Sequence, residues 1–286
     1  MKHSLKHLSY ALLLAVLFFG LSAGSAFAQE YKETYNQALE AARAKKYDAA
    51  HGLFVKAGQQ AKQAGDNDVA AKANKVAAQI DFNSGKKLSD SEQYEQALKH
   101  FESGIKLSPT YTNNYLGKAV ALKSMKREDD AIATYQKLIE VGKSAQDREA
   151  VTAGEKAIRD HYVYIASTAL SRNGDKTTRT DANEALASLK KLQETLDVSE
   201  DPDVHYYTAV AHNAAGDYAQ ALASGNKALE LHKGSKSDKA KIYFLLGEAN
   251  MYQGNTAAAR DAFTNATFGT YKPLAEHYLE TLGKSN

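Results

Sequence analysis

Two short segments of the sequence end in the way that a phosphate-binding loop ends. They are VGKS at Val141–Ser144 and LGKS at Leu282–Ser285. A phosphate loop requires the pattern G-x-x-x-x-G-K-[ST], whose first glycine lets the backbone amides curve around the phosphates. Lys137 stands at that position in one segment and Tyr278 in the other. We therefore predict no nucleotide site at either place.

The other residues that could do nucleophilic, acid–base or metal chemistry are not grouped by their spacing. Four S-x-x-K segments occur, but the S-D-N and K-T-G segments that accompany a catalytic S-x-x-K motif do not. His205 and His212 are seven residues apart, which is about 10 Å along a helix and too far for one metal ion. The sequence therefore indicates no catalytic residue, no metal site and no cofactor.

The first 28 residues have the organisation of a secretory signal peptide. A basic start precedes a 12-residue apolar run, Tyr10–Leu21, and Ala26 and Ala28 form an A-x-A cleavage site. The run is shorter than the roughly 20 residues of a membrane-spanning helix. We expect cleavage after Ala28, export across the inner membrane of a bacterium, a periplasmic location and no membrane insertion of the mature chain. An uncleaved anchor or a buried helix is the alternative.

The composition of the mature chain narrows the classes of partner. The signal segment holds two of the 36 Lys and Arg residues and no acidic residue, which leaves 34 basic against 34 acidic side chains. Nucleic-acid binding requires a basic surface, so we expect no nucleic-acid partner. The chain has no cysteine, and disulfides and thiol chemistry are therefore excluded.

Pairs of small residues recur at corresponding places along the mature chain. The first member is Ala38, Gly85, Ala119, Ala166, Ala209 or Gly247, and the second is Ala50, Ala97, Ala131, Ala185, Ala221 or Ala259. A bulky residue follows the second member by four positions, namely Phe54, Phe101, Tyr135, Leu189 and Phe263, with Gly225 as the exception. A glycine inside a helix costs about 1 kcal/mol relative to alanine, and tertiary packing can offset this cost. The columns therefore predict helical pairs in which small residues face bulky ones.

These columns, together with turns such as GDY, GNT and KKY, resemble the tetratricopeptide repeat (TPR). The unit of this family is a pair of antiparallel helices with a period of about 34 residues. Gly85 and Ala119 are 34 residues apart, and the other spacings run from 38 to 47. The resemblance implies an all-α fold, a right-handed α-solenoid of about six helical hairpins over residues 29–286. We expect hairpins at 31–62, 78–109, 112–142, 157–193, 202–232 and 240–270, and a capping helix at 273–283.

The prolines and the longer spacings fit this division. Pro109, Pro202 and Pro273 all stand at expected junctions, and proline suits the first turn of a helix but breaks its interior. The two 47-residue steps hold alanine-rich, charged inserts. We expect these inserts to lengthen helices.

The family resemblance implies a non-catalytic scaffold that holds a protein or peptide segment on its concave helical surface. Two positions of each first helix face that surface in the family. The corresponding positions of this chain, together with Lys241, predict a trough on the concave surface. Its residues are Tyr35, Phe82, Lys86, Leu116, Val120, Tyr206, Val210, Lys241, Phe244 and Glu248. The lysine and asparagine with which some members grip a terminal carboxylate are missing from the first of these columns. A partner segment with aliphatic or aromatic anchors therefore fits this trough best.

Two alternatives remain open at this point. In one, the apolar side chains of the trough only pack against neighbouring helices, because buried apolar residues most often form core. In the other, the chain is an envelope enzyme, or part of one, on an all-helical toroid or solenoid. Converging carboxylates or histidines would favour the enzyme, and a long trough of apolar and polar side chains would favour peptide capture.

Overall fold

The computed structural model describes residues 26–174 and 176–284, and these residues form helices and no β-strand. The chain divides into two compact units, Met1–Glu155 and Lys156–Asn286, with the boundary inside one long helix. The helices of the first unit are α2 (Ala26–Arg43), α3 (Tyr47–Gln63), α4 (Asn67–Asp90), α5 (Tyr94–Leu107), α6 (Thr112–Ser124) and α7 (Glu128–Ser144). Helix α8 (Arg148–Ser171) contains the boundary. The second unit continues with α9 (Arg179–Thr195), α10 (Pro202–Ala215), α11 (Tyr218–Leu231), α12 (Lys236–Tyr252), α13 (Thr256–Asn265), the 3-10 turn η1 (Gly269–Tyr271) and α14 (Lys272–Lys284).

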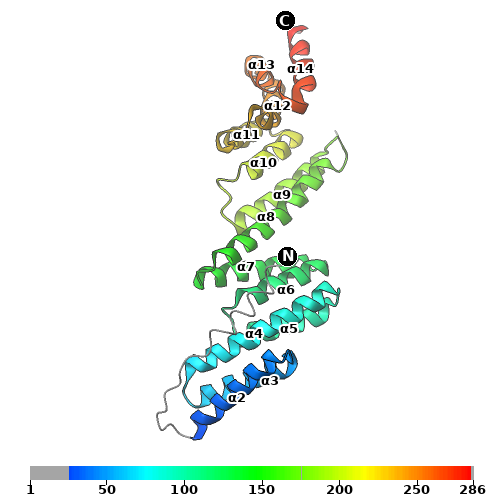
Figure 1. Cartoon of the computed structure of the whole chain (residues 1–286). Coiled ribbons are helices and arrows are strands. Elements are labelled where there is room, and N and C mark those ends of the chain that lie inside the picture. Colours follow the sequence, from blue (N-terminus) through cyan, green and yellow to red (C-terminus); the bar gives the residue numbers. More distant parts are fainter. Residues whose placement is uncertain (1–25, 175, 285–286) are drawn as a thin grey trace. The chain divides into compact units, whose positions relative to one another are not determined.

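Helices that follow one another in the chain pack against one another in each unit (Figure 1). In the first unit the hairpins are α2 with α3, α4 with α5 and α6 with α7, and in the second they include α10 with α11 and α12 with α13. Neighbouring hairpins stack through α3 on α4, α5 on α6, α9 on α10 and α11 on α12. This arrangement confirms the predicted all-α fold built from solenoid-type helical hairpins.

The columns of small and bulky residues form the core, as predicted. Every member of both small columns is buried, and so are Phe54, Phe101, Tyr135, Leu189 and Phe263. Gly85 shows why the first column is small: a Cβ atom added there would lie 2.7 Å from the ring of Phe101. Contacts this short do not occur between packed carbon atoms. The glycine therefore lets α4 and α5 approach closely around the phenylalanine.

The exception in the bulky column, Gly225 on α11, is filled from the next hairpin. A Cβ atom on Gly225 would lie 2.8 Å from Cδ2 of Leu246 on α12. Leu246 is itself buried and belongs to a cluster with Ala228 and Ile242. The missing bulk in one repeat is thus supplied by a leucine of the following repeat.

Tight turns between the helices use one residue in the left-handed conformation. Gly216 and Gly254, in the GDY and GNT segments, have φ angles of 84° and 80°. At the corresponding place in KKY, Lys45 has a φ of 59°, and Glu92 and Lys126 have φ angles of 60°. A side chain in this conformation places its Cβ atom too close to the backbone, whereas glycine has no such cost. Three of these turns therefore carry a small amount of backbone strain.

Two helices are longer than the rest, as the inserts predict. Helices α4 and α8 each have 24 residues, whereas α5, α10 and α11 have 14. Pro202 begins α10, and Pro273 lies in the first turn of α14. Helix α14 packs against α13 and places Leu282 on Phe263. It therefore covers the last hairpin, at the place where the capping helix was predicted.

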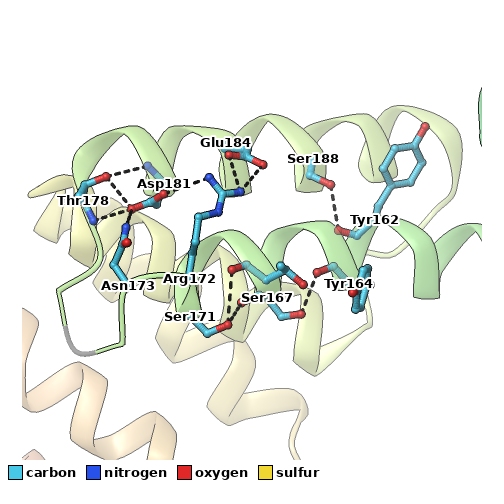
Figure 2. Close-up of polar contacts among 11 residues, drawn as sticks. Tyr162, Tyr164, Ser167, Ser171, Arg172, Asn173, Thr178, Asp181, Glu184 and Ser188 are labelled. Carbon is cyan, nitrogen blue, oxygen red and sulfur yellow. Dashed lines mark hydrogen bonds and ion pairs between the residues drawn. The ribbon is translucent and has the colours of Figure 1, made fainter.

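A buried carboxylate organises the long loop between α8 and α9 (Figure 2). Asp181 is 4% exposed and accepts hydrogen bonds from the Thr178 hydroxyl at 2.6 Å and from Nδ2 of Asn173 at 2.8 Å. Arg172, the first residue after α8, reaches Glu184 on α9 with Nη2 2.9 Å from Oε1. These contacts satisfy the polar groups of the loop at the start of α9. We interpret this polar cluster as structural.

The predicted signal peptide lies almost entirely outside the described residues, which begin at position 26. Within the described part of the chain, no helix is long and apolar enough to cross a membrane.

Candidate partner-binding surface

Aromatic side chains from α10, α12, η1 and α14 meet in the second unit. We call Tyr206, Phe244, Tyr271 and Tyr278 the aromatic cluster. The ring of Phe244 lies 5.3 Å from that of Tyr271 and 5.5 Å from that of Tyr278, measured between centroids. Tyr206 joins the cluster beside Tyr271, whose phenol is among the causes that raise the pKa of Tyr206. All four side chains are half-buried, so each keeps part of its surface exposed to solvent.

Burial gives Tyr206 an unusual electrostatic environment. Desolvation is the largest cause that raises its pKa far above the ordinary value, followed by Tyr271, Tyr207 and the charge of Glu248. The phenol is therefore neutral at any physiological pH and acts as a hydrogen-bonding group on an apolar ring. Such amphipathic rings are enriched at protein interfaces because one end is apolar and the other can be hydrated.

A half-buried carboxylate, Glu248 of α12, borders the aromatic cluster. Its Oε2 accepts a weak hydrogen bond from Nδ2 of Asn213 on α10, at 3.4 Å. Burial raises the pKa of Glu248 to about 7. Its charge also raises the pKa values of Tyr206 and Tyr278, so it lies near both phenols. This carboxylate is poorly compensated, because burial penalises its charge and no cation among the described residues forms an ion pair with it.

Positive charge lies at the opposite end of the aromatic cluster. Nζ of Lys241 lies 4.5 Å from the centre of the Tyr206 ring and 3.9 Å from Oδ1 of Asp203. Arg159 of α8 contacts Asp203 at 3.0 Å and also forms a two-pronged pair with Asp201. The groups named here are two cations, Lys241 and Arg159, and three carboxylates, Asp201, Asp203 and Glu248.

The structure brings four of the five predicted trough residues of the second unit to this surface. Tyr206 and Phe244 belong to the aromatic cluster, and Lys241 and Glu248 border it at opposite ends. The fifth, Val210, is half-buried on α10, one turn after Tyr206. Their role in binding stays a prediction.

The five predicted trough residues of the first unit lie mostly at half-buried positions. Tyr35 packs edge-on against Phe54, with 5.3 Å between ring centroids, and is part of the α2–α3 core. Phe82 contacts Phe101 at 6.2 Å and Tyr111 at 6.3 Å. Of the remaining three, Leu116 is half-buried, Val120 is exposed by 48%, and Lys86 is exposed and pairs with Asp90 of its own helix. Of these five residues, only Tyr35 and Phe82 are aromatic.

Sequence reasoning missed two rings of the aromatic cluster and the amide that contacts Glu248. Asn213 lies seven residues after Tyr206, two helical turns along the same face, so extending that column would have found it. Tyr271 and Tyr278 come from η1 and α14, outside the repeated hairpins. No spacing rule predicts them, because the packing of the final helix on α13 places them here.

Sequence reasoning also missed a polar cluster in the first unit, centred on Asp81 of α4. Asp81 is 3% exposed. Nε2 of His51 on α3 lies 3.0 Å from one carboxylate oxygen, and Nδ1 of His100 on α5 lies 3.1 Å from the other. The Ser103 hydroxyl donates to Asp81 at 2.7 Å. One buried carboxylate thus joins three helices.

The Asp81 cluster contains serine, histidine and aspartate, but its connectivity differs from that of a hydrolase. A catalytic triad works in series, with the serine on a histidine and the histidine on the carboxylate. Here Ser103, His51 and His100 all contact Asp81 directly. Burial raises the pKa of Asp81, but the hydrogen bonds from His51, Ser103 and His100 outweigh it and lower that pKa overall. We interpret the cluster as a structural connection between helices. Among the described residues, no three histidine or acidic side chains converge in a way that would hold a metal ion.

Comparison with protein families identifies the repeats. Two segments match tetratricopeptide-repeat models, residues 112–141 in the first unit and residues 179–236 in the second. The first spans α6 and most of α7, and the second spans α9, α10 and α11. Both segments are therefore similar to the tetratricopeptide repeat, as the sequence columns predict. The second match includes Tyr206 of the aromatic cluster.

Solved structures of TPR proteins also resemble the chain, at low identity. YrrB, described as a TPR protein with an unusual peptide-binding site, is 17% identical over 72% of this chain and 91% of its own, with a TM-score of 0.35. A tetratricopeptide repeat protein from Parabacteroides merdae is 15% identical over 89% of this chain and 99% of its own, with a TM-score of 0.33. A thermophilic TPR protein from Thermus thermophilus is 17% identical over 88% of this chain and 98% of its own, with a TM-score of 0.30. Comparison with curated protein sequences gives no match.

Proposed function

We propose that this chain is a non-catalytic scaffold of the bacterial cell envelope, which holds a protein or peptide segment on the concave side of its helical repeats. The observation that carries the proposal is the aromatic cluster, a set of half-buried rings bordered by charges of both signs. Interfaces are enriched in tyrosine and other aromatic residues, which act as anchors or receive them. The similarity to the tetratricopeptide repeat supports a protein partner, because stacked repeats form extended binding surfaces.

The partner in this proposal carries aliphatic or aromatic anchors. The half-buried rings of Tyr206 and Phe244 offer apolar contacts, and Val210 extends them by one turn of α10. The balanced charge of the mature chain supports a protein rather than a nucleic acid. The periplasmic location rests on the signal-peptide pattern at the N-terminus.

Site-specific photo-cross-linking in the cells that produce the protein tests partner binding. A photoreactive phenylalanine analogue is placed at Val210, one helical turn after Tyr206 on α10, and in a matched strain at Gln220, an exposed position on α11. The proposal predicts a discrete cross-linked protein from Val210 and none from Gln220. Equal products from both positions, or none from either, would contradict it.

The envelope location has its own test. The intact mass of the native protein, purified from the periplasmic fraction, should correspond to a chain that begins at Gln29. A native chain that still begins at Met1 would overturn the export proposal and leave the binding proposal standing.

A further inference from the structure

Among the charged groups bordering the aromatic cluster, Glu248 stands apart. Arg159, Asp201, Asp203 and Lys241 all have ion-pair partners in the second unit. The carboxylate of Glu248 has only the amide of Asn213, and at 3.4 Å this is a weak hydrogen bond. A charge removed from water in this way is costly unless an opposite charge or several hydrogen bonds compensate it.

The amide next to Glu248 is also incompletely satisfied. Oδ1 of Asn213 is buried from solvent and has no hydrogen-bond partner. Two acceptor groups, a carboxylate and an amide oxygen, therefore lie together on α10 and α12 without adequate donors. Buried acceptors without donors are rare in folded proteins, because each one loses its hydration without a replacement.

We propose that the Glu248 carboxylate receives a lysine or arginine side chain of the bound partner, whose stem lies against the rings of Tyr206 and Tyr278. This inference rests on the proposed function and names the chemistry of one anchor. A partner's ammonium or guanidinium group supplies only donors and a positive charge, which are what the Glu248 carboxylate lacks.

The neighbouring rings suit the same occupant. Lys241 already places its ammonium group over the Tyr206 ring at 4.5 Å, so this aromatic environment accommodates a cation. Lys241 does not itself neutralise Glu248, because the two lie seven residues apart on α12, about 10 Å along the helix, and its ammonium group pairs with Asp203. Arg159 is likewise engaged by Asp160, Asp201 and Asp203, so neither cation compensates Glu248.

Selection of peptides from a phage-displayed library of random 12-residue sequences tests this anchor. It is carried out in parallel on the mature wild-type protein, on Glu248→Gln and on Glu280→Gln, which neutralises an exposed glutamate of α14. The proposal predicts apolar anchors together with a lysine or arginine at a fixed offset in peptides selected by the wild type and by Glu280→Gln. Glu248→Gln should retain the apolar anchors and lose the basic one.

A binding titration then measures the contribution of the anchor. One selected peptide is compared with its counterpart in which norleucine, or citrulline for arginine, replaces the basic residue. We expect the neutral peptide to bind the wild-type protein about tenfold more weakly than the basic peptide does. Glu248→Gln should bind the neutral and the basic peptide equally tightly. Selected peptides with apolar anchors and no basic residue would overturn the inference and leave the proposed function intact. Failure to select any recurrent motif would contradict both.

Discussion

Gly247 on α12 lies directly against the ring of Phe263 on α13: a Cβ atom added to the glycine would lie 2.6 Å from two ring carbons. The phenylalanine cannot easily move away, because its other side stacks on Tyr278 at 4.9 Å between centroids. We therefore expect Gly247→Ala to destabilise the second unit by about 2 kcal/mol, the usual cost of overpacking a core. Urea unfolding of the mature protein measures this change.

The same substitution at Gly52 is the matched control. Gly52 lies inside α3, and a Cβ atom there would have no neighbour within 4 Å. Gly52→Ala should stabilise the protein by about 1 kcal/mol through helix propensity alone. If both substitutions changed stability in the same direction, the close packing at Gly247 would be contradicted.

A second prediction concerns the strained turn between α6 and α7. Lys126 has a φ of 60°, so replacing it with glycine should relieve backbone strain and stabilise the first unit by about 1 kcal/mol. Lys123→Gly, three residues earlier and inside α6, should cost about 1 kcal/mol instead. Thermal unfolding compares the two variants, and a lower midpoint for Lys126→Gly would contradict the turn geometry.

The repeated fold was predictable from sequence because packing of small against bulky residues leaves a periodic signature. Gly85 and Phe101 show it directly, since both positions recur in other hairpins. The aromatic cluster was only half predictable. Tyr206 and Phe244 occupy repeated positions, whereas Tyr271 and Tyr278 reach the cluster through the packing of the unrepeated C-terminal segment.

The Asp81 cluster was not predictable for a different physical reason. His51 and His100 are 30 residues before and 19 residues after Asp81 and come from different helices. Their convergence depends on the register in which the 24-residue helix α4 packs between α3 and α5. No local pattern in the sequence encodes that register.

The Asp81 cluster predicts a pH-dependent contribution to stability. The hydrogen bond to Asp81 is the largest cause that raises the pKa of His51 above its usual 6.5, so this stabilisation is complete below 6.5 and is lost as the pH rises through the folded-state pKa. The pKa of Asp81 is lowered from 3.8, so its stabilisation is present above 3.8 and is lost as the pH falls through the folded-state pKa. Together they give the largest contribution between these two values.

Asp81→Asn tests this contribution against Asp90→Asn, which removes an exposed carboxylate from the same helix. Asp81→Asn should cost about 2 kcal/mol at pH 5.5 and less at pH 8.5, because the stabilisation linked to the raised pKa of His51 is lost as the pH rises. Asp90→Asn should change the unfolding free energy by less than about 0.5 kcal/mol at either pH. A cost for Asp81→Asn that is the same at both pH values would contradict ion pairing in the cluster.

Glu248 should destabilise the folded protein at high pH. Burial raises its pKa from 4.5 to about 7, so the folded state holds this proton more tightly than the unfolded chain does. The free energy of unfolding therefore decreases as the pH rises from 4.5 through 7. We expect Glu248→Gln to be more stable than the wild type by about 2 kcal/mol at pH 8 and equally stable at pH 4. Denaturant unfolding at both pH values checks this, and a Gln variant less stable than the wild type at pH 8 would refute it.

The central claim, that the aromatic cluster binds a partner segment, is tested most directly by titrating a synthetic peptide of the segment cross-linked at Val210 into two variants. Tyr206→Ala removes a ring of the cluster, and Leu222→Ala removes a side chain of α11 that packs on the same core residues. The account predicts a similar loss of stability in both variants, at least tenfold weaker binding by Tyr206→Ala, and binding within twofold of the wild type by Leu222→Ala. Equal binding by the two variants would show that Tyr206 serves only the core.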